Sequence, residues 1–334
     1  MVRNKNKKVV IITEGGLTMG LGHVYRTIAL AKELSKFSDV SFLTTSGEVV
    51  LNKVRENGFK ISKSKDEIEL KKQLNLTNPD VVIIDKLEVD ENFANYIKTD
   101  LKVRLIIFGN VSSANKYADV VINAIIGTNY KNRTYLDKNT NTLYLEGPKY
   151  LVLRKEFYDH KNSYKFRNNL ERILLIFGGS DQANLSSQVA DKLLSMNHDF
   201  RINIVLGPAF KFDKELNTIL KKHNVRRNKT RVYRNVNNIS KLMRDADLVF
   251  TSAGTAMFES FCIGVPTIVF YQNSLQRNMF RNFIMTYDFN EIINLEDFIF
   301  DIYKNYYKYK RKIDELDVGG GKKEIIDAII GGRK

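Results

Sequence analysis

Residues 14–26 place an acid, several glycines, a histidine and an arginine in one short stretch, EGGLTMGLGHVYR. It follows the apolar run VVIIT, so we expect a strand that leads through a glycine loop into a helix beginning near His23. The positive end of a helix dipole disfavours added charge and so keeps an imidazole neutral. A neutral imidazole can accept a proton, and we expect His23 to act as a general base. The alternative is a histidine that only caps or packs the helix.

The other residues of this loop have roles that the chemistry of their side chains suggests. Glu14 comes at the strand end, where it can orient the imidazole or bind a sugar hydroxyl. Arg26 follows one turn after His23 and can contact a phosphate or hold the loop in place. Gly20 and Gly22 allow a tight turn and a close approach of ligand to backbone. The glycines do not complete a dinucleotide fingerprint, and the chain contains no P-loop motif.

The stretch FGGSDQAN repeats this arrangement in the second half of the chain. Gly178 and Gly179 would let backbone amides approach a ligand. Ser180 or Asp181 is expected to cap the following helix, and Asn184 to reach the ligand from its first turn. An ordinary capped turn between a strand and a helix would have the same sequence.

A third glycine turn, in TSAGTAMFESFCIGVPTIVF, has the features of a nucleotide site. Ser252, Gly254 and Thr255 would open a helix whose N-terminus can bind a diphosphate without a metal. Glu259 lies one turn further on, where a carboxylate can accept the two hydroxyls of a ribose. The alternative for Glu259 is a solvated helix carboxylate.

Metal, cofactor and serine-hydrolase chemistry find little support in the sequence. The four histidines form no H-x-x-x-H pair, and G-x-S-x-G is absent. We therefore expect no metal and no cofactor. The single cysteine, Cys262, suits a reducing compartment.

The elements that must position these residues alternate between short apolar runs and helical periodicity, which is typical of an α/β fold. Expected strands are 8–13, 40–44, 80–85, 103–108, 119–123, 172–177, 201–206, 231–234, 247–251 and 266–270. Expected helices include 23–36, 182–196, 212–222, 254–263 and 274–286. We predict two Rossmann-like, doubly wound domains, 1–150 and 151–334, facing each other across a central cleft, with a C-terminal helix in the second.

Size and charge set the remaining limits. The 334 residues are 43% hydrophobic and 27% charged with 4 prolines, which is typical of a globular chain. The formal net charge of +15 suits an anionic membrane face or phosphate-bearing substrates, and the alternative is charge spread over solvated faces. No RNA-binding or helix-turn-helix signature accompanies the charge, so no nucleic-acid partner is expected. No run approaches a membrane span and the N-terminal apolar run is too short for a signal peptide. We expect a cytoplasmic monomer or weak oligomer with at most peripheral membrane contact.

Six stretches together match a known family in order along the chain. The chain resembles the UDP-2,4-diacetamido-2,4,6-trideoxy-β-L-altropyranose hydrolases of pseudaminic acid biosynthesis, which are relatives of the MurG-like GT-B glycosyltransferases. The matching stretches are MGLGHVYRTIALAKEL, VVIIDKLEVD, EGPKYLVLRKEF, FGGSDQAN, SAGTAMFESFCIGVPTIVF and GGGKKEIIDAII.

This resemblance implies a GT-B fold and hydrolysis of the bond between an amino sugar's anomeric carbon and UDP, with inversion. It makes His23 the base that activates water, places Asp85 with the catalytic residues, and makes Glu259 the ribose ligand. It assigns substrate and UDP contacts to Gly20, Gly22, Arg26, Gly178, Gly179, Ser180, Asn184, Ser252, Gly254, Thr255 and Gln276.

The chain departs from the family pattern mainly in the half that would contact the sugar. The Arg-x-Asp motif reads Ile12-Thr13-Glu14, Asp-x-Tyr reads Asp85-Lys86-Leu87, Asp-Asp reads Gly109-Asn110, and Asn-Gln reads Leu275-Gln276. Two alternatives therefore stay open beside the hydrolase: a glycosyltransferase that uses a UDP-sugar donor, and a catalytically inactive partner that binds a nucleotide sugar.

Overall fold

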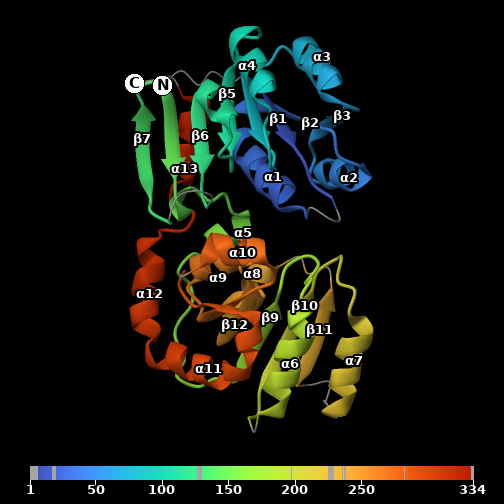
Figure 1. Ribbon diagram of the computed structural model, residues 1–334, viewed down its shortest axis with the longest axis vertical. Coiled ribbons are helices and arrows are strands. Elements are labelled where there is room, and N and C mark those ends of the chain that lie inside the picture. Colours follow the sequence, from blue (N-terminus) through green and yellow to red (C-terminus); the bar gives the residue numbers. More distant parts are fainter. Residues whose placement is uncertain are drawn as a thin grey trace. The chain divides into compact units, whose positions relative to one another are not determined.

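The computed structural model describes residues 7–16, 20–125, 130–196, 198–224, 229–234, 236, 238–281 and 283–331. It divides into two compact units, and the chain passes from one to the other after Arg154 and again after Glu315 (Figure 1). The expected domain boundary at residue 150 lies close to the first of these crossings. The second crossing was not expected from the sequence.

The first unit is built on an eight-stranded sheet of order β3-β2-β1-β4-β5-β6-β8-β7, in which only β7 and β8 pair antiparallel. The order reverses between β1 and β4, and such a switch point is where doubly wound sheets bind ligands, beyond the carboxyl ends of the strands. The strands are β1 (Lys7–Thr13), β2 (Ser38–Thr44), β3 (Lys60–Lys63), β4 (Val81–Asp85), β5 (Arg104–Phe108), β6 (Val120–Asn123), β7 (Arg133–Asp137) and β8 (Thr142–Glu146).

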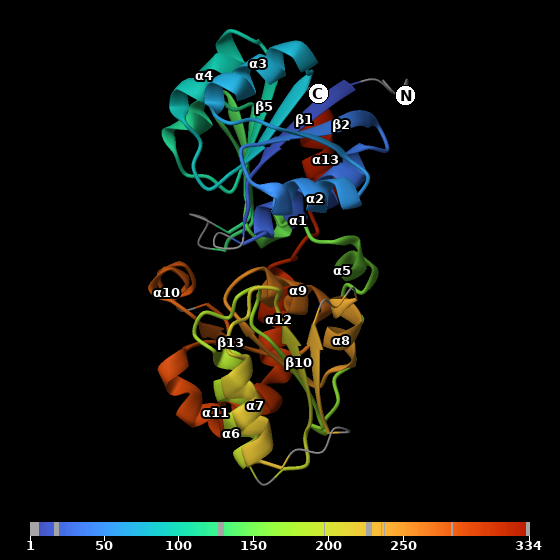
Figure 2. The ribbon, with the colours of Figure 1, turned by 90° about the vertical axis from the view of Figure 1, so that its right-hand side faces the viewer.

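Helices cover both faces of this sheet, because alternate residues of its strands are buried on opposite sides (Figure 2). Val9 and Ile11 pack with α1, α2 and α13, whereas Val10 and Ile12 pack with α3 and α4. The helices are α1 (Gly22–Leu34), α2 (Glu48–Glu56), α3 (Glu67–Thr77), α4 (Glu91–Thr99) and α13 (Lys322–Ile330), with short 3₁₀ turns η1 (Ser113–Tyr117) and η2 (Pro148–Tyr150).

The C-terminal helix α13 belongs to the first unit, so its expected place in the second domain is wrong. Ile325 and Ile329 are buried in the first unit's core. Two cations bind carbonyls near the end of the helix: Arg104 Nη2 donates to Ala328 O at 2.7 Å and Lys7 Nζ to Ile330 O at 2.9 Å. An amphipathic pattern predicts the helix and its apolar face, but not which sheet that face will cover.

The second unit contains a parallel six-stranded sheet of order β11-β10-β9-β12-β13-β14, with its switch point between β9 and β12. One face packs on α6, α7 and α11, and α8 and α9 contact the sheet strands as well. The strands are β9 (Arg172–Ile176), β10 (Arg201–Leu206), β11 (Thr230–Arg234), β12 (Leu248–Ser252), β13 (Thr267–Tyr271) and β14 (Thr286–Asp288). The helices are α5 (Lys155–Asp159), α6 (Leu185–Ser195), α7 (Asp213–Lys222), α8 (Ile239–Asp245), α9 (Thr255–Ile263), α10 (Ser274–Phe280), η3 (Phe289–Asn294), α11 (Leu295–Lys304) and α12 (Tyr306–Glu315).

All ten expected strands and most expected helices occur within a few residues of their expected bounds. The expected helix 274–286 is an exception, because α10 ends at Phe280 and the chain turns into β14. Aromatic packing accounts for this turn: Phe280 and Phe283 both lie against Phe258, with ring centroids 6.2 and 5.9 Å away.

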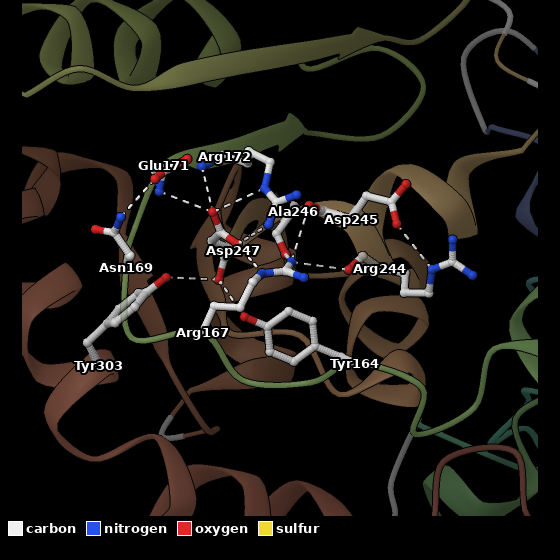
Figure 3. A network of polar contacts seen from close by, with 10 residues as sticks. All are labelled: Tyr164, Arg167, Asn169, Glu171, Arg172, Arg244, Asp245, Ala246, Asp247 and Tyr303. Atoms are coloured by element: carbon white, nitrogen blue, oxygen red, sulfur yellow. Dashed lines mark hydrogen bonds and ion pairs between the residues drawn. The ribbon is translucent and has the colours of Figure 1, made fainter.

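At the amino-terminal edge of the second sheet, buried Asp247 ties the incoming chain to β9 and β12 (Figure 3). Its carboxylate accepts from Arg167 Nε at 2.5 Å, from Arg172 Nη2 at 3.1 Å, and from the backbone N–H groups of Glu171 and Arg172. Arg167 Nη2 also donates to Ala246 O at 2.7 Å, just after α8. Burial by itself raises the pKa of Asp247, but these donors outweigh it and hold the pKa below its usual range.

Candidate active site

The best-defined cluster in the first unit joins His23, on the first turn of α1, to Asp85, the last residue of β4. Strands β1 and β4 are neighbours and pair Thr13 with Asp85. The loop that follows β1 therefore begins beside Asp85, and it leads into α1. His23 Nδ1 lies 2.6 Å from Asp85 Oδ1. Residues 62 apart in the sequence are thus in direct contact.

Arg26 completes this cluster by binding the same carboxylate through two of its nitrogens. Its Nε donates to Asp85 Oδ2 at 2.7 Å and its Nη2 to Oδ1 at 2.5 Å. Asp85 has no exposed surface, so burial alone would raise its pKa. The charge of Arg26 and the hydrogen bonds from Arg26 and His23 outweigh burial and lower the pKa of Asp85 instead. Asp85 is therefore ionised at neutral pH although it is fully buried.

An ionised Asp85 determines which nitrogen of His23 carries the proton. A carboxylate only accepts hydrogen bonds, so the short contact requires Nδ1–H to donate to Asp85. Nε2 of the neutral ring then carries the lone pair. The side chain of His23 is 19% exposed, which leaves the ring partly accessible. The geometry therefore suits a base at Nε2 with Asp85 as its orienting partner.

Two expectations for this loop need correction or restatement. Glu14 forms an ion pair with Lys86, 3.3 Å away, and the carboxylate that contacts the imidazole is that of Asp85. The guanidinium of Arg26 is hydrogen-bonded to Asp85 and lies over the Phe108 ring, 5.9 Å from its centroid, which favours a positioning role over a phosphate contact. The reason in both cases is the adjacency of β1 and β4, which places Asp85 beside Thr13 at the strand end from which the loop leaves.

The glycines of the loop serve its backbone shape. Gly16 and Gly20 exchange two backbone hydrogen bonds of 3.0 and 2.8 Å, and Gly20 adopts a φ of +85° that favours glycine. Residues 17–19 lie outside the described residues. Gly22 opens α1, which has no side-chain cap on its N-terminal N–H groups.

In the second unit, two glycine turns leave adjacent strands at the switch point of the sheet. Gly178 follows β9 and Ser252 ends β12, and a Cβ on Gly178 would lie 3.8 Å from Ser252 Oγ. The turn after β10 packs against the same loop, because Ala209 N–H donates to Gly179 O at 2.9 Å. At Gly207, a Cβ would lie 2.3 Å from the carbonyl oxygens of both Gly178 and Gly179, so only glycine fits there.

The two helix N-termini at this edge differ in whether a side chain already occupies them. Asp181 accepts hydrogen bonds of 2.8 Å from the N–H groups of Leu185 and Ser186, the first two residues of α6. Burial raises the pKa of Asp181, and these N–H groups oppose that shift. By contrast, α9 starts at Thr255 with no side-chain cap. The N-terminus of α9 is therefore the better anion site of the two.

The remaining expected residues of the second unit lie around this edge. Gly179 and Thr255 are exposed, and Ser180 and Gly254 are half-buried. Asn184 precedes α6 in the left-handed conformation. Glu259 is 6% exposed and not the solvated carboxylate of the alternative reading. Gln276 Oε1 accepts from Gln272 N–H at 2.8 Å, and Gln272 Nε2 in turn donates to Phe177 O at 2.7 Å.

Sequence reasoning missed Gly207 and gave Asp181 only as one of two possible caps. Gly207-Pro208 directly after a strand was a visible turn signal, but its close approach to Gly178 depends on β9 and β10 being neighbours. Among the described residues there is no group of three or more His, Cys, Asp or Glu side chains placed to hold a metal ion. The described helices are also all too short or too polar to cross a membrane.

Comparison with known proteins places this geometry in context. Residues 173–283 match the model of the glycosyltransferase family 28 C-terminal domain. An uncharacterised protein of Methanocaldococcus jannaschii, MJ1062, is 44% identical over 328 residues; these cover 96% of this chain and 66% of that relative, just under two thirds of its length. The UDP-2,4-diacetamido-2,4,6-trideoxy-β-L-altropyranose hydrolase of Campylobacter jejuni is 24% identical over 261 residues, 77% of this chain and 88% of that protein.

Solved structures agree on the architecture. MurG of Acinetobacter baumannii superposes with a TM-score of 0.64 over 97% of this chain and 99% of its own, at 14% identity. Identity this low speaks for the fold alone. The chain therefore has the two-domain, α/β GT-B fold, and its residues 173–283 are similar to the glycosyltransferase family 28 C-terminal domain.

Proposed function

We propose that this protein is a metal-independent UDP-sugar hydrolase. It would cleave the anomeric C–O bond of a UDP-linked diacetamido-trideoxy sugar, invert the anomeric centre, and release UDP and a free sugar for the biosynthesis of a pseudaminic-type acid. The observation that carries this proposal is the pairing of His23 with the buried, ionised Asp85. The similarity to the Campylobacter jejuni hydrolase supports the choice of reaction.

In the proposed reaction, His23 acts on the attacking water. Nε2 takes one proton from the water as its oxygen bonds to the anomeric carbon, and the bond from that carbon to the diphosphate oxygen breaks. The bonding electrons leave with UDP. Asp85 stabilises the imidazolium that forms, because Nδ1–H already donates to its carboxylate. Water enters opposite the leaving group, so the anomeric configuration inverts.

The leaving group is where the second unit would contribute. UDP departs as an anion, and backbone N–H groups aimed at developing charge lower the barrier without a metal. The uncapped N-terminus of α9, at Gly254 and Thr255, is suited to the diphosphate, whereas Asp181 already occupies the N-terminus of α6. Glu259, on the next turn of α9, is buried and would accept the ribose hydroxyls.

The proposal is tested by incubating the protein with UDP-diacetamido-trideoxy sugars in H₂¹⁸O. We expect equimolar UDP and free sugar, with ¹⁸O on the anomeric carbon and none on UDP, and the opposite anomer at early times. The His23→Ala variant should bind UDP like the wild type yet release about 10²–10⁴-fold less sugar. Label on the phosphate, or equal rates in wild type and His23→Ala, would overturn the mechanism.

A glycosyltransferase is the second candidate, and the family 28 C-terminal domain in residues 173–283 favours it. The same base would then deprotonate an acceptor hydroxyl instead of water. If UDP is released only when an acceptor is added, and the sugar is found on that acceptor, the protein is a glycosyltransferase and not a hydrolase. UDP binding without release under either condition would leave a nucleotide-sugar-binding protein without catalysis.

A further inference from the structure

An ion pair joins the ends of β1, which leads to the loop of His23, and β4, which ends at Asp85, and has no part in the proposed proton transfer. Lys86 Nζ is 3.3 Å from Glu14 Oε1, and the two side chains are 24% and 19% exposed. Glu14 follows β1 and Lys86 follows β4, one residue beyond the last strand pair, Thr13 with Asp85. The pair therefore lies at the switch point of the first sheet, where such folds bind their ligands.

The chemistry of this pair limits what it can bind. A carboxylate only accepts hydrogen bonds and an ammonium only donates them. An anionic substituent would be repelled by the carboxylate of Glu14, and a cationic one by the ammonium of Lys86. Two adjacent neutral groups suit both partners, if one has an N–H or O–H to donate and the other an oxygen to accept. Vicinal substituents of a sugar ring have this arrangement.

We propose that Glu14 and Lys86 determine the sugar specificity of this protein and bind two vicinal neutral polar substituents of the sugar ring. Glu14 accepts from the N–H or O–H of one substituent, while Lys86 donates to the oxygen of its neighbour. The inference rests on the proposed function, since it assumes a UDP-sugar ligand. It assigns to Lys86 a role in specificity, separate from the part of His23 and Asp85 in proton transfer.

The competing explanation is an ion pair that only ties β1 to β4. A purely structural ion pair contributes to stability, by about 1 kcal/mol or less for partly exposed side chains, and leaves ligand specificity unchanged. The two explanations differ in one measurable quantity, the sugar increment, which we define as the dissociation constant for UDP divided by that for the UDP-sugar.

The experiment measures both dissociation constants by titration calorimetry in a His23→Ala background, so that the ligand is not consumed. The probes are UDP and a UDP-2,4-diacetamido-2,4,6-trideoxy sugar. We expect Lys86→Met and Glu14→Gln each to lower the sugar increment about tenfold, because each loses a hydrogen bond to a charged group. The affinity for UDP alone should stay within about twofold.

Three additions keep the result interpretable. Each single variant leaves one charge of the pair without its partner, which by itself can disturb the fold. The Glu14→Gln/Lys86→Met double variant removes both charges, and we expect it to lose the sugar increment as the single variants do. The matched control is Lys98→Met, which breaks the 2.8 Å ion pair with Asp119 at the amino-terminal edge of the same sheet and should change neither constant. A 3-deoxy analogue of the sugar should bind wild type and variants with equal increments.

Each failure has its own meaning. If the variants melt at a lower temperature but keep the wild-type sugar increment, the ion pair contributes only to stability and the inference is wrong. A wild-type protein that binds UDP and the UDP-sugar equally well would overturn the inference and leave UDP binding intact. A wild-type protein that does not bind UDP at all would overturn the proposed function, and this inference with it.

Discussion

Nδ1 of His23 lies 2.6 Å from Oδ1 of Asp85, and that carboxylate is completely buried. A buried carboxyl would ordinarily be protonated more easily, but Arg26 and His23 reverse the shift and hold the charge. A fixed negative charge at Nδ1 makes the ring donate there, so the opposite nitrogen is free to accept a proton. This relationship is the basis of the first two predictions.

Replacing Asp85 by Asn should lower kcat for UDP release by about 10²–10⁴-fold. The amide can present its NH₂ group to Nδ1, which would move the ring proton to Nε2 and remove the base. UDP affinity should be unchanged. The measurement is single-turnover UDP release, with Asp80→Asn as control; Asp80 accepts from Lys8 N–H at 2.7 Å, at the opposite edge of the sheet. A rate within threefold of wild type would remove Asp85 from the mechanism.

The Arg26→Gln variant separates a positioning role from a phosphate contact. We expect kcat to fall tenfold or more, by an order-of-magnitude argument, while the dissociation constant for UDP stays the same, because Arg26 holds the charge of Asp85. Arg26→Lys retains the charge without the two-nitrogen contact and should give an intermediate rate. Weaker UDP binding at an unchanged kcat would instead make Arg26 a phosphate ligand.

Gly207→Ala tests the glycine turns of the second unit. The added Cβ would lie 2.3 Å from two carbonyl oxygens, so the loop at Gly178 and Gly179 must shift. We expect UDP affinity to fall about tenfold or more. Gly47→Ala is the matched control, since nothing lies within 4 Å of its added Cβ. Calorimetric titration with UDP measures the dissociation constants of the two variants. If Gly207→Ala binds UDP as tightly as Gly47→Ala, the loop at Gly178 and Gly179 does not contribute to nucleotide binding.

Asp247 makes stability depend on pH. Its pKa is lowered in the folded protein, so its contribution is present above the unfolded value of about 3.9 and is lost as pH falls through the folded pKa. Asp247→Asn should lower the free energy of unfolding at pH 7 by about 1–3 kcal/mol, because the donors of Arg167 and Arg172 lose their charged acceptor.

The pH dependence is measured by urea unfolding between pH 7 and pH 3, followed by circular dichroism. The wild type should lose stability in the acid part of this range, and the difference between wild type and Asp247→Asn should shrink there. A difference that stays constant down to pH 3 would mean that the carboxylate of Asp247 is not the titrating group.

Local patterns were enough to predict most of the fold. Runs such as VVIIT and RILLIF are buried on both faces, and only central parallel strands need such runs. Four of the described strands were not predicted: β3, β7, β8 and β14. Of these, β3, β7 and β14 are edge strands, and β7 is almost entirely exposed, whereas β8 lies between β6 and β7. The helix at α10 was predicted, but its early end at Phe280 was not, because aromatic contacts with Phe258 accompany that end rather than a local stop signal.

The candidate site was predicted less completely, and the misses share one cause. His23, Gly254 and Glu259 could be named from residue type and distance to a helix start, because those depend on neighbours in the chain. The partner of the imidazole could not, since Glu14 is nearer in sequence but Asp85 is nearer in space. The strand order that brings β4 beside β1 is non-local information.

The amino-acid sequence therefore determined an α/β chain with glycine turns at strand ends and predicted a histidine at a helix start, since periodicity and turn chemistry act over a few residues. Tertiary structure decided which carboxylate holds that histidine, which helix N-terminus is left uncapped, and to which unit the C-terminal helix belongs. These contacts join residues far apart in the chain. Their energies depend on burial and strand adjacency, which arise only when the whole sheet has formed.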